Sequence, residues 1–286
     1  MTVNLIVQSP ALDLSLIDQA AALVQANGVQ WINKTAARLL DVTQDNDSEE
    51  LIKAWASEKH TDIAFVNPQA RLSDCKILVM DMDSTLINIE CIDEIAAYAG
   101  LKAEVAAITE RSMRGEITEF ADSLKLRVGY LEGLDQSVLE KVYTERLMLN
   151  PGAENLIRTV QQAGIKTMLV SGGFTFFTSR LKERLQLDAA HANVLQTNDQ
   201  CKLTGQVTGP IIDAQGKADL LADFARVHNA KPEHIIAIGD GANDLKMLAS
   251  AHYAVAYRAK PVVQAQARFA LNHSPLDAVL NWFAQA

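Results

Sequence analysis

The sequence has little cysteine and no pattern typical of a disulfide framework. Its 286 residues include only Cys75, Cys91 and Cys201, and no two of them form a Cys-x-x-Cys pair. An odd number of widely spaced cysteines is typical of reduced thiols rather than of a disulfide-bonded secreted domain. A chain of this length buries about 75% of its unfolded surface, so it needs no disulfides to be stable.

Long apolar runs and clusters of basic residues are also missing. No stretch reaches the roughly 18 apolar residues that a transmembrane helix requires. The N-terminus, MTVNLIVQSPALDLS, lacks the basic and apolar regions of a signal peptide. The net charge of −9 without a Lys/Arg cluster argues against binding to nucleic acid or to anionic membranes. We therefore expect a soluble protein of the cytoplasm.

Several common cofactor motifs do not occur. The segment GDGAND (239–244) lacks the third glycine of GxGxxG, and Gly209 lies too far before Gly216-Lys217 for a Walker A loop. The sequence contains no HExxH, and Leu86 stands where an EF-hand loop that began at Asp81 would need glycine. Nucleotide, zinc-hydrolase and EF-hand chemistry are therefore unsupported.

From Lys76 onward, apolar strands alternate with helical patterns. This alternation predicts parallel strands joined by right-handed crossovers, hence a doubly wound, Rossmann-like α/β sheet over residues 75–286. Residues 91–149 hold only helical patterns and predict a helical cap between the first two core strands. Asn150-Pro151 predicts the start of the next helix, with Asn150 as its N-cap and Pro151 as its first residue, and Gly164 predicts its end. The predicted core strands are Ile77–Met80, Lys166–Val170, Ile235–Ile238 and Tyr253–Ala256, with a β-hairpin at 193–208.

Residues 1–70 show a separate β-α-β-β-α-β pattern, followed by a polar linker at 67–74. The order of its elements resembles that of ACT-type regulatory modules, which predicts a small α+β domain with a regulatory role. A plain packing domain, or one that forms a homodimer, is the alternative. The expected elements are strands at 3–9, 29–32, 38–42 and 62–66 and helices at 14–26 and 48–60.

Three short polar motifs each follow a predicted core strand. They are Asp81–Thr85, Ser171–Gly173 and Gly239–Asp244. In an open parallel sheet the carboxyl ends of the strands share one edge, where such folds bind ligands. Motifs far apart in the sequence are therefore expected to meet in space.

The acids of these motifs predict a magnesium site. Asp81, Asp83, Asp240 and Asp244 at one edge would resist full ionisation, and a hard divalent cation relieves that repulsion. For any one acid alone, a helix cap or a turn is an equally good interpretation.

The other two motifs suggest an anion site. Ser171-Gly172-Gly173 offers a hydroxyl and unhindered N–H groups before a helix, which suits a phosphate, although a glycine pair alone often marks only a turn. Lys217 is expected near a helix start. It is either a solvated lysine or an inward one that holds phosphate.

Taken together, DMDST, SGG, Lys217 and GDGAND resemble the four-motif signature of the haloacid dehalogenase superfamily over about residues 76–286. Within it, DMDSTLINIECIDEIA, MRGEI, LVSGGFTFFT, DAQGKAD and AIGDGANDLKML are similar to the phosphoserine phosphatase family. The resemblance implies Mg²⁺-dependent hydrolysis of O-phosphoserine to serine and phosphate, the last step of serine biosynthesis.

The resemblance also implies a role for each core residue. Asp81 would be the nucleophile that forms an aspartyl-phosphate, and Asp83 the general acid and then the base. Mg²⁺ would bind Asp81, the Asp83 carbonyl and Asp240, with Asp244 supporting that site. The phosphoryl group would be held by Ser171, Gly172, Lys217 and Asn243.

Substrate recognition is expected in the cap. The family pattern places Glu90 at the substrate ammonium and Arg127 at its carboxylate, with Met113 and Phe120 excluding water. Taken singly, Met113 and Phe120 are more typical of core residues, and Glu90 and Arg127 of surface charges. Cys91, beside Glu90, is interpreted as a small buried hydrophobe.

Two other functions remain compatible with these residues. A phosphotransferase, or a phosphatase for another small phosphorylated metabolite, would keep the fold and change only the cap. A receiver-like switch phosphorylated on Asp81 is the non-catalytic alternative. Asp83 argues against the switch, because a nearby acid/base would shorten the life of an acyl phosphate.

Overall fold

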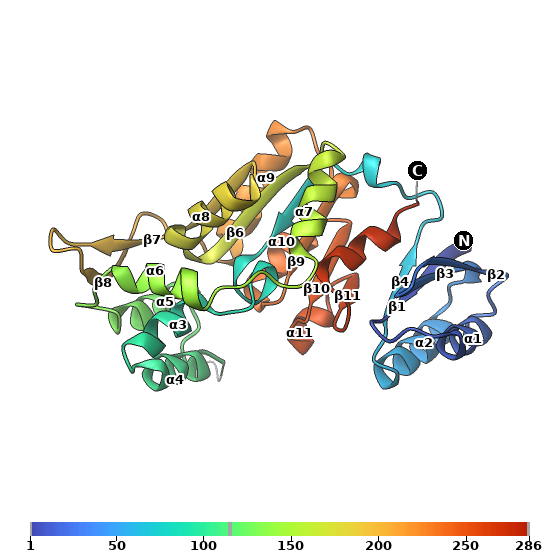
Figure 1. Ribbon diagram of the computed structural model, residues 1–286, viewed down its shortest axis with the longest axis horizontal. Coiled ribbons are helices and arrows are strands. Elements are labelled where there is room, and N and C mark those ends of the chain that lie inside the picture. Colours follow the sequence, from blue (N-terminus) through green and yellow to red (C-terminus); the bar gives the residue numbers. More distant parts are fainter. Residues whose placement is uncertain (1, 114–115, 285–286) are drawn as a thin grey trace. The chain divides into compact units, whose positions relative to one another are not determined.

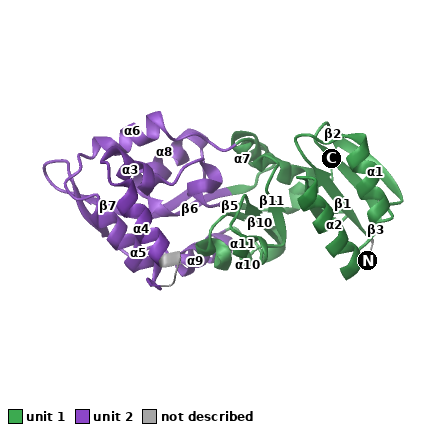
Figure 2. Cartoon of the chain, turned by 90° about the horizontal axis from the view of Figure 1, so that it is seen from below, with its two compact units in different colours: residues 1–78, 151–166, 228–286 green, residues 79–150, 167–227 purple. Residues whose placement is uncertain are grey.

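A computed structural model describes residues 2–113 and 116–284 of the chain. Its contacts divide the chain into two compact units, shown in Figure 2. The first unit comprises residues 1–78, 151–166 and 228–286, and the second comprises 79–150 and 167–227. Within the described ranges, none of the helices has the length and apolar character needed to cross a membrane.

Residues 2–66 form a four-stranded antiparallel sheet in the order β2-β3-β1-β4, with α1 and α2 on one face (Figure 1). Leu5, Val7 and Leu39 of the sheet pack with Ile17 and Ile52 of the helices in a buried core. Asp13 and Asp45 cap the two helices through bonds to the backbone N–H groups of Leu16 and Ser48. The β-α-β-β-α-β order expected from the sequence is confirmed, with bounds β1 Thr2–Gln8, α1 Leu14–Leu23, β2 Gly28–Asn33, β3 Ala36–Thr43, α2 Asn46–Glu58 and β4 Asp62–Val66.

The remaining strands form a seven-stranded sheet in the order β11-β10-β9-β5-β6-β7-β8. The pairs β9–β10, β10–β11 and β6–β7 are parallel, and β7–β8 is the antiparallel hairpin predicted from the sequence. β5 and β9 are buried along their whole length, as continuous apolar strands in such sheets are. The strands are β5 Ile77–Met80, β6 Lys166–Phe174, β7 Ala189–Thr197, β8 Leu203–Thr208, β9 Ile235–Gly239, β10 Tyr253–Tyr257 and β11 Phe269–Leu271.

The helical insertion between β5 and β6 is also confirmed. It consists of α3 Cys91–Tyr98, α4 Lys102–Met113, α5 Phe120–Gly129 and α6 Ser137–Glu145, all in the second unit. The sequence interpretation of Asn150 as a helix cap was wrong. α7 starts at Ala153 after Gly152, whose φ of 83° suits glycine, and Asn150 bonds elsewhere. The other helices are α7 Ala153–Gln162, α8 Thr175–Leu185, α9 Ala214–Val227, α10 Leu245–Ala249 and α11 Pro261–Gln264.

Within the first unit, polar side chains of the N-terminal sheet bind the C-terminal segment. The buried carboxylate of Asp62 accepts backbone N–H bonds from Asn272, His273 and Ser274, at 2.7 Å for the first and last. Arg38 donates to the carbonyl of Phe283 at 2.8 Å. The compact units therefore do not follow the domain boundary near residues 70–75, which stays a prediction from the sequence.

Candidate active site

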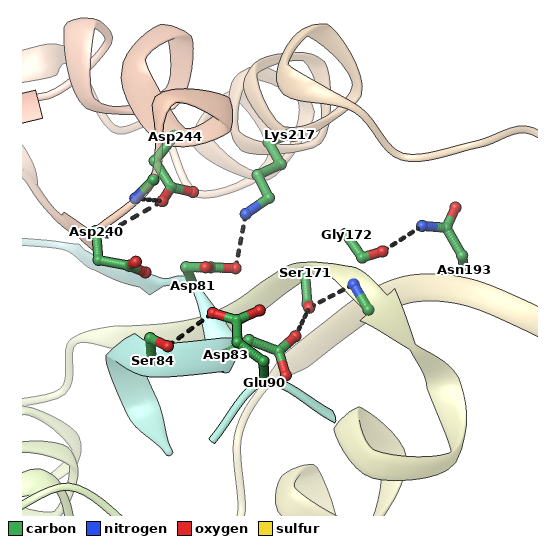
Figure 3. A network of polar contacts seen from close by, with 12 residues as sticks. Asp81, Asp83, Ser84, Glu90, Ser171, Gly172, Asn193, Lys217, Asp240 and Asp244 are labelled. Carbon is green, nitrogen blue, oxygen red and sulfur yellow. Dashed lines mark hydrogen bonds and ion pairs between the residues drawn. The ribbon is translucent and has the colours of Figure 1, made fainter. Parts of the chain in front are cut away.

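Asp81 and Asp83 follow the buried strand β5 and face different partners (Figure 3). Asp83 Oδ1 accepts the backbone N–H of Cys91 at 2.8 Å, and its Oδ2 accepts the Ser171 hydroxyl at 3.2 Å. Burial raises the pKa of Asp83, while these hydrogen bonds and the charge of Lys217 oppose that shift. The carboxyl of Asp83 is thereby held nearer to its protonated form than an exposed aspartate would be.

The loop that carries these acids is shaped by local hydrogen bonds. Ser84 has a φ of 57°, in the left-handed region, and its hydroxyl donates to Glu90 Oε1 at 2.7 Å. The buried side-chain amide of Asn150 donates to the carbonyls of Thr85 and Ile87 at 2.8 and 3.0 Å. This loop has no regular ladder to satisfy its carbonyls, so Asn150 takes that role.

Three of the four predicted metal acids come together. One carboxylate oxygen from each of Asp81, Asp240 and Asp244 lies within 4.8 Å of the other two. Asp244 is fully buried and accepts the backbone N–H groups of Asp240 and Gly241 at 3.1 and 2.9 Å. A side chain at position 239 would lie 2.5 Å from Asp244 Cγ, so the close approach requires Gly239. Converging carboxylate oxygens fit a hard divalent cation such as Mg²⁺.

Lys217 is the inward lysine of the two alternatives. It lies on α9 with no exposed side-chain surface, and its Nζ is 2.6 Å from Asp81 Oδ1. Burying a lysine is costly unless it is paired, and Asp81 supplies the pairing charge. The ammonium therefore stands beside the proposed nucleophile.

The Ser171–Gly173 segment lies at an irregular end of β6. The register against β7 shifts between Val170 and Phe174, and α8 begins only at Thr175. The Gly173 N–H donates to Ser171 Oγ at 2.8 Å. A Cβ at position 172 would lie 2.8 Å from the ring of Phe120, and one at 173 would lie 2.6 Å from Asp83 Oδ2. A side chain at either position would therefore displace Phe120 or Asp83.

Three of the predicted cap residues interact with residues of this site. Arg127, on α5, is half-buried, which lowers its pKa, while the carboxylates of Asp93, Glu90 and Asp83 act in the opposite direction. Phe120 lies over Gly172, and Glu90 is exposed and bonds Ser84.

Two further predicted residues complete the comparison. Met113 is the last residue of α4, and its side chain lies outside the described part of the structure. Asn243 is half-buried, and a Cβ at position 241 would lie 2.2 Å from its Oδ1.

Sequence reasoning missed Asp93 and Asn193 and gave Asn150 the wrong role. Asp93 faces the charge of Arg127, and Asn193 bonds the Gly172 carbonyl at 2.8 Å. The signal for Asn193 was weak: a single asparagine inside a predicted hairpin.

Comparisons with known proteins show the family of this chain. The family model described as haloacid dehalogenase-like hydrolase matches residues 78–249, and a domain of unknown function, DUF4072, matches 5–50. A phosphoserine phosphatase of Polaromonas sp. is 49% identical over 222 residues, covering 76% of this chain and 94% of its own.

Two solved structures are similar as well. A HAD family hydrolase from Salmonella enterica serovar Typhi has a TM-score of 0.89 at 30% identity and covers 100% of this chain and 99% of its own. A structure described as the phospho-aspartyl intermediate analogue of phosphoserine phosphatase has a TM-score of 0.68 at 37% identity, over 73% of this chain and 99% of its own. The chain therefore belongs to the haloacid dehalogenase-like hydrolase family.

Proposed function

We propose that this protein is a Mg²⁺-dependent phosphomonoesterase that hydrolyses O-phosphoserine to serine and phosphate. The observation that carries the proposal is the different surroundings of two acids on one loop. Asp81 pairs with Lys217 and lies beside two further carboxylates, whereas Asp83 contacts an amide and a hydroxyl and has a raised pKa. The relatives named phosphoserine phosphatase support the substrate.

The two acids divide the chemistry. A carboxylate oxygen of Asp81 attacks phosphorus and forms an aspartyl-phosphate, as the bond from phosphorus to the serine oxygen breaks. The departing oxygen takes the proton of Asp83. In the second half Asp83 removes a proton from water, which attacks phosphorus, breaks the bond to Asp81 and releases phosphate.

The remaining core residues hold the transferring group. Ser171, the Gly172 N–H, Lys217 and Asn243 would bind the phosphoryl oxygens, where fixed donors stabilise developing charge. Asp81, Asp240 and the carbonyl of Asp83 would hold Mg²⁺, with Asp244 beside them. Bound there, the ion supplies positive charge to the transferring oxygens.

The cap would select the amino acid. Arg127 would bind the serine carboxylate with two parallel hydrogen bonds, and Glu90 the ammonium. Phe120 and Met113 would exclude water above the phosphoryl group. Residues 1–70 would serve as an ACT-like regulatory or homodimerising module, residues 75–286 as the phosphatase domain, and the protein would act in the cytoplasm.

Phosphate release tests the proposal directly. The wild type should release phosphate from phosphoserine with Mg²⁺, faster than from phosphothreonine. Asp81→Asn should reduce that rate by about 10⁴-fold or more, because an amide is a poor nucleophile. Far-ultraviolet circular dichroism of the variant controls for folding. Undiminished turnover by a folded Asp81→Asn protein would remove Asp81 as the nucleophile, and a wild type that hydrolyses only other phosphate esters would refute the substrate.

A further inference from the structure

Asn193 occupies a position on β7 that no motif indicated. It is 2% exposed and pairs with Phe174, directly after the register shift that sets Ser171–Gly173 out of the regular β6–β7 ladder. Its side-chain Nδ2 donates to the Gly172 carbonyl at 2.8 Å, as Figure 3 shows. Its Oδ1 accepts the backbone N–H of Ile212, also at 2.8 Å. One buried carboxamide therefore holds two separate segments.

The first segment is the proposed phosphate-binding loop. The Gly172 carbonyl and the Gly173 N–H belong to one planar peptide and point in opposite directions. Fixing the carbonyl on Asn193 therefore aims the N–H at Ser171 Oγ, which it reaches at 2.8 Å. The Ser171 hydroxyl then donates to Asp83 Oδ2 at 3.2 Å. A continuous chain of hydrogen bonds runs from Asn193 to the proposed acid/base.

Neither glycine can hold this peptide by itself. Glycine has no Cβ and adopts many backbone conformations at little cost, so a Gly-Gly peptide is free to rotate unless something fixes it. Rotation would turn the Gly172 carbonyl oxygen toward the Ser171 side of the loop, where an anion is expected to bind. A carbonyl oxygen there repels phosphate, whereas an N–H attracts it.

The second segment leads into the helix of Lys217. Ile212 precedes Asp213, whose carboxylate accepts the Gly216 N–H at 2.8 Å and whose carbonyl accepts the Lys217 N–H at 2.9 Å. Asp213 is thus the residue that caps the start of α9. Because Ile212 is bonded to Asn193, the start of this helix and the glycine loop share one anchor.

We propose that Asn193 is a positioning residue for phosphoryl transfer, which orients the Gly172–Gly173 peptide and sets the start of the Lys217 helix relative to it. The inference rests on the proposed function and deepens it, since Asn193 acts through Ser171, Gly172 and Lys217 and not on the substrate. It applies to any phosphate ester that the site accepts. The loss of activity caused by a substitution at Asn193 should therefore be independent of the leaving group.

Asn193→Asp separates the two hydrogen bonds. The variant keeps an acceptor for Ile212 but places an oxygen against the Gly172 carbonyl, with almost no change in volume. The matched control is Thr167→Val. Thr167 is fully buried on β6, the strand that carries Gly172 and Gly173, and its hydroxyl donates to Asp188, the residue before β7, at 3.0 Å. The control variant removes a side-chain hydrogen bond that is part-buried, like the bond from Asn193 to Gly172, but lies at the opposite end of β6.

The kinetic outcomes are distinct. Asn193→Asp should lower kcat about tenfold or more for phosphoserine and for p-nitrophenyl phosphate alike, because misoriented donors weaken transition-state binding. The inhibition constant of inorganic phosphate should rise by a similar factor. Thr167→Val should keep kcat and the phosphate inhibition constant within about twofold of the wild type, even if its melting temperature falls as much as that of Asn193→Asp. Unchanged kcat and phosphate inhibition in folded Asn193→Asp, or equal losses in Thr167→Val, would overturn the positioning role.

A separate arm keeps this test independent of the substrate. Titration calorimetry with inorganic phosphate and Mg²⁺ compares the wild type, Asn193→Asp, Asn193→Ala and Thr167→Val. Weaker phosphate binding only in the two Asn193 variants supports the positioning role, even if phosphoserine proves not to be the substrate. Equal phosphate affinity in all four proteins refutes it, whatever the activity on phosphoserine.

Discussion

Replacing Lys217 by methionine tests the electrostatic balance of the site. The lysine side chain has no exposed surface, and the Asp81 side chain that it pairs with is only 7% exposed. Methionine fills similar space without the charge. The substitution therefore removes one partner of a buried ion pair and leaves the other in place.

The size of the effect follows from the distances. Carboxylate oxygens of Asp81, Asp240 and Asp244 lie within 4.8 Å of one another. At that separation each pair of charges repels by about 3.5 kcal/mol with an effective dielectric constant near 20. Breaking a buried ion pair costs roughly 3–5 kcal/mol. We expect the free energy of unfolding of Lys217→Met to fall by about that amount in metal-free buffer, with partial relief from protonation of one carboxyl.

Magnesium should restore more stability to the variant than it adds to the wild type. An ion that binds only the folded state stabilises it by about 2.7 kcal/mol at a concentration 100 times Kd. Without the lysine, the three acids attract the cation more strongly, so this increment should grow. Turnover should nevertheless fall by about 10²–10³-fold, because the transferring oxygens lose a fixed positive charge.

Urea unfolding in EDTA measures the stability lost without metal, and the same measurement in Mg²⁺ gives the stability that the ion adds. Lys53→Met is the control, because Lys53 is 63% exposed in its pair with Glu49 and should cost at most about 1 kcal/mol. Wild-type stability of Lys217→Met in EDTA would contradict a buried ion pair. A smaller magnesium increment than in the wild type would contradict repulsion among the three acids.

Two further predictions concern the cap and the thiols. Arg127→Ala should raise KM for phosphoserine by roughly 10²-fold through loss of a bidentate carboxylate contact. Its effect on p-nitrophenyl phosphate should stay within a few fold, and equal losses of kcat/KM would remove Arg127 from substrate recognition. Burial raises the pKa of Cys75 to about 12 and that of Cys91 well above its usual value, whereas Cys201 is exposed. Iodoacetamide at neutral pH should therefore label one thiol per folded chain, as counted by intact mass, and three after denaturation. Rapid labelling of two or three thiols in folded protein would contradict that burial.

Much of the fold could be predicted because the central strands β5, β9 and β10 are apolar and buried along their whole length. Ile77–Met80 is buried on both faces, so its sequence is a continuous apolar run that ends at Asp81. Asp62–Val66 was predicted with its observed bounds. The meeting of Asp81 with Asp240 and Asp244 followed from the strand order of parallel sheets, without knowledge of any side-chain contact.

The asparagines could not be predicted in the same way. Asn150 bonds carbonyls more than 60 residues away in the sequence, and Asn193 bonds Gly172, 21 residues away. Their partners are backbone groups that have no identity in the sequence and become exposed only where a strand or loop is irregular. Asn150 was therefore read as a local helix cap, which is the usual role of asparagine before proline.

The different roles that we propose for Asp81 and Asp83 follow from their neighbours, because the two side chains are chemically the same. Asp81 faces an ammonium at 2.6 Å, which favours its charged, nucleophilic form. The Asp83 carboxylate accepts hydrogen bonds from the Cys91 N–H and the Ser171 hydroxyl, and burial raises its pKa against these bonds and the charge of Lys217. Two carboxyl groups in such different surroundings can serve as nucleophile and acid on one loop. In the proposed mechanism, the closeness of the two acids lets one attack phosphorus while the other protonates the leaving oxygen.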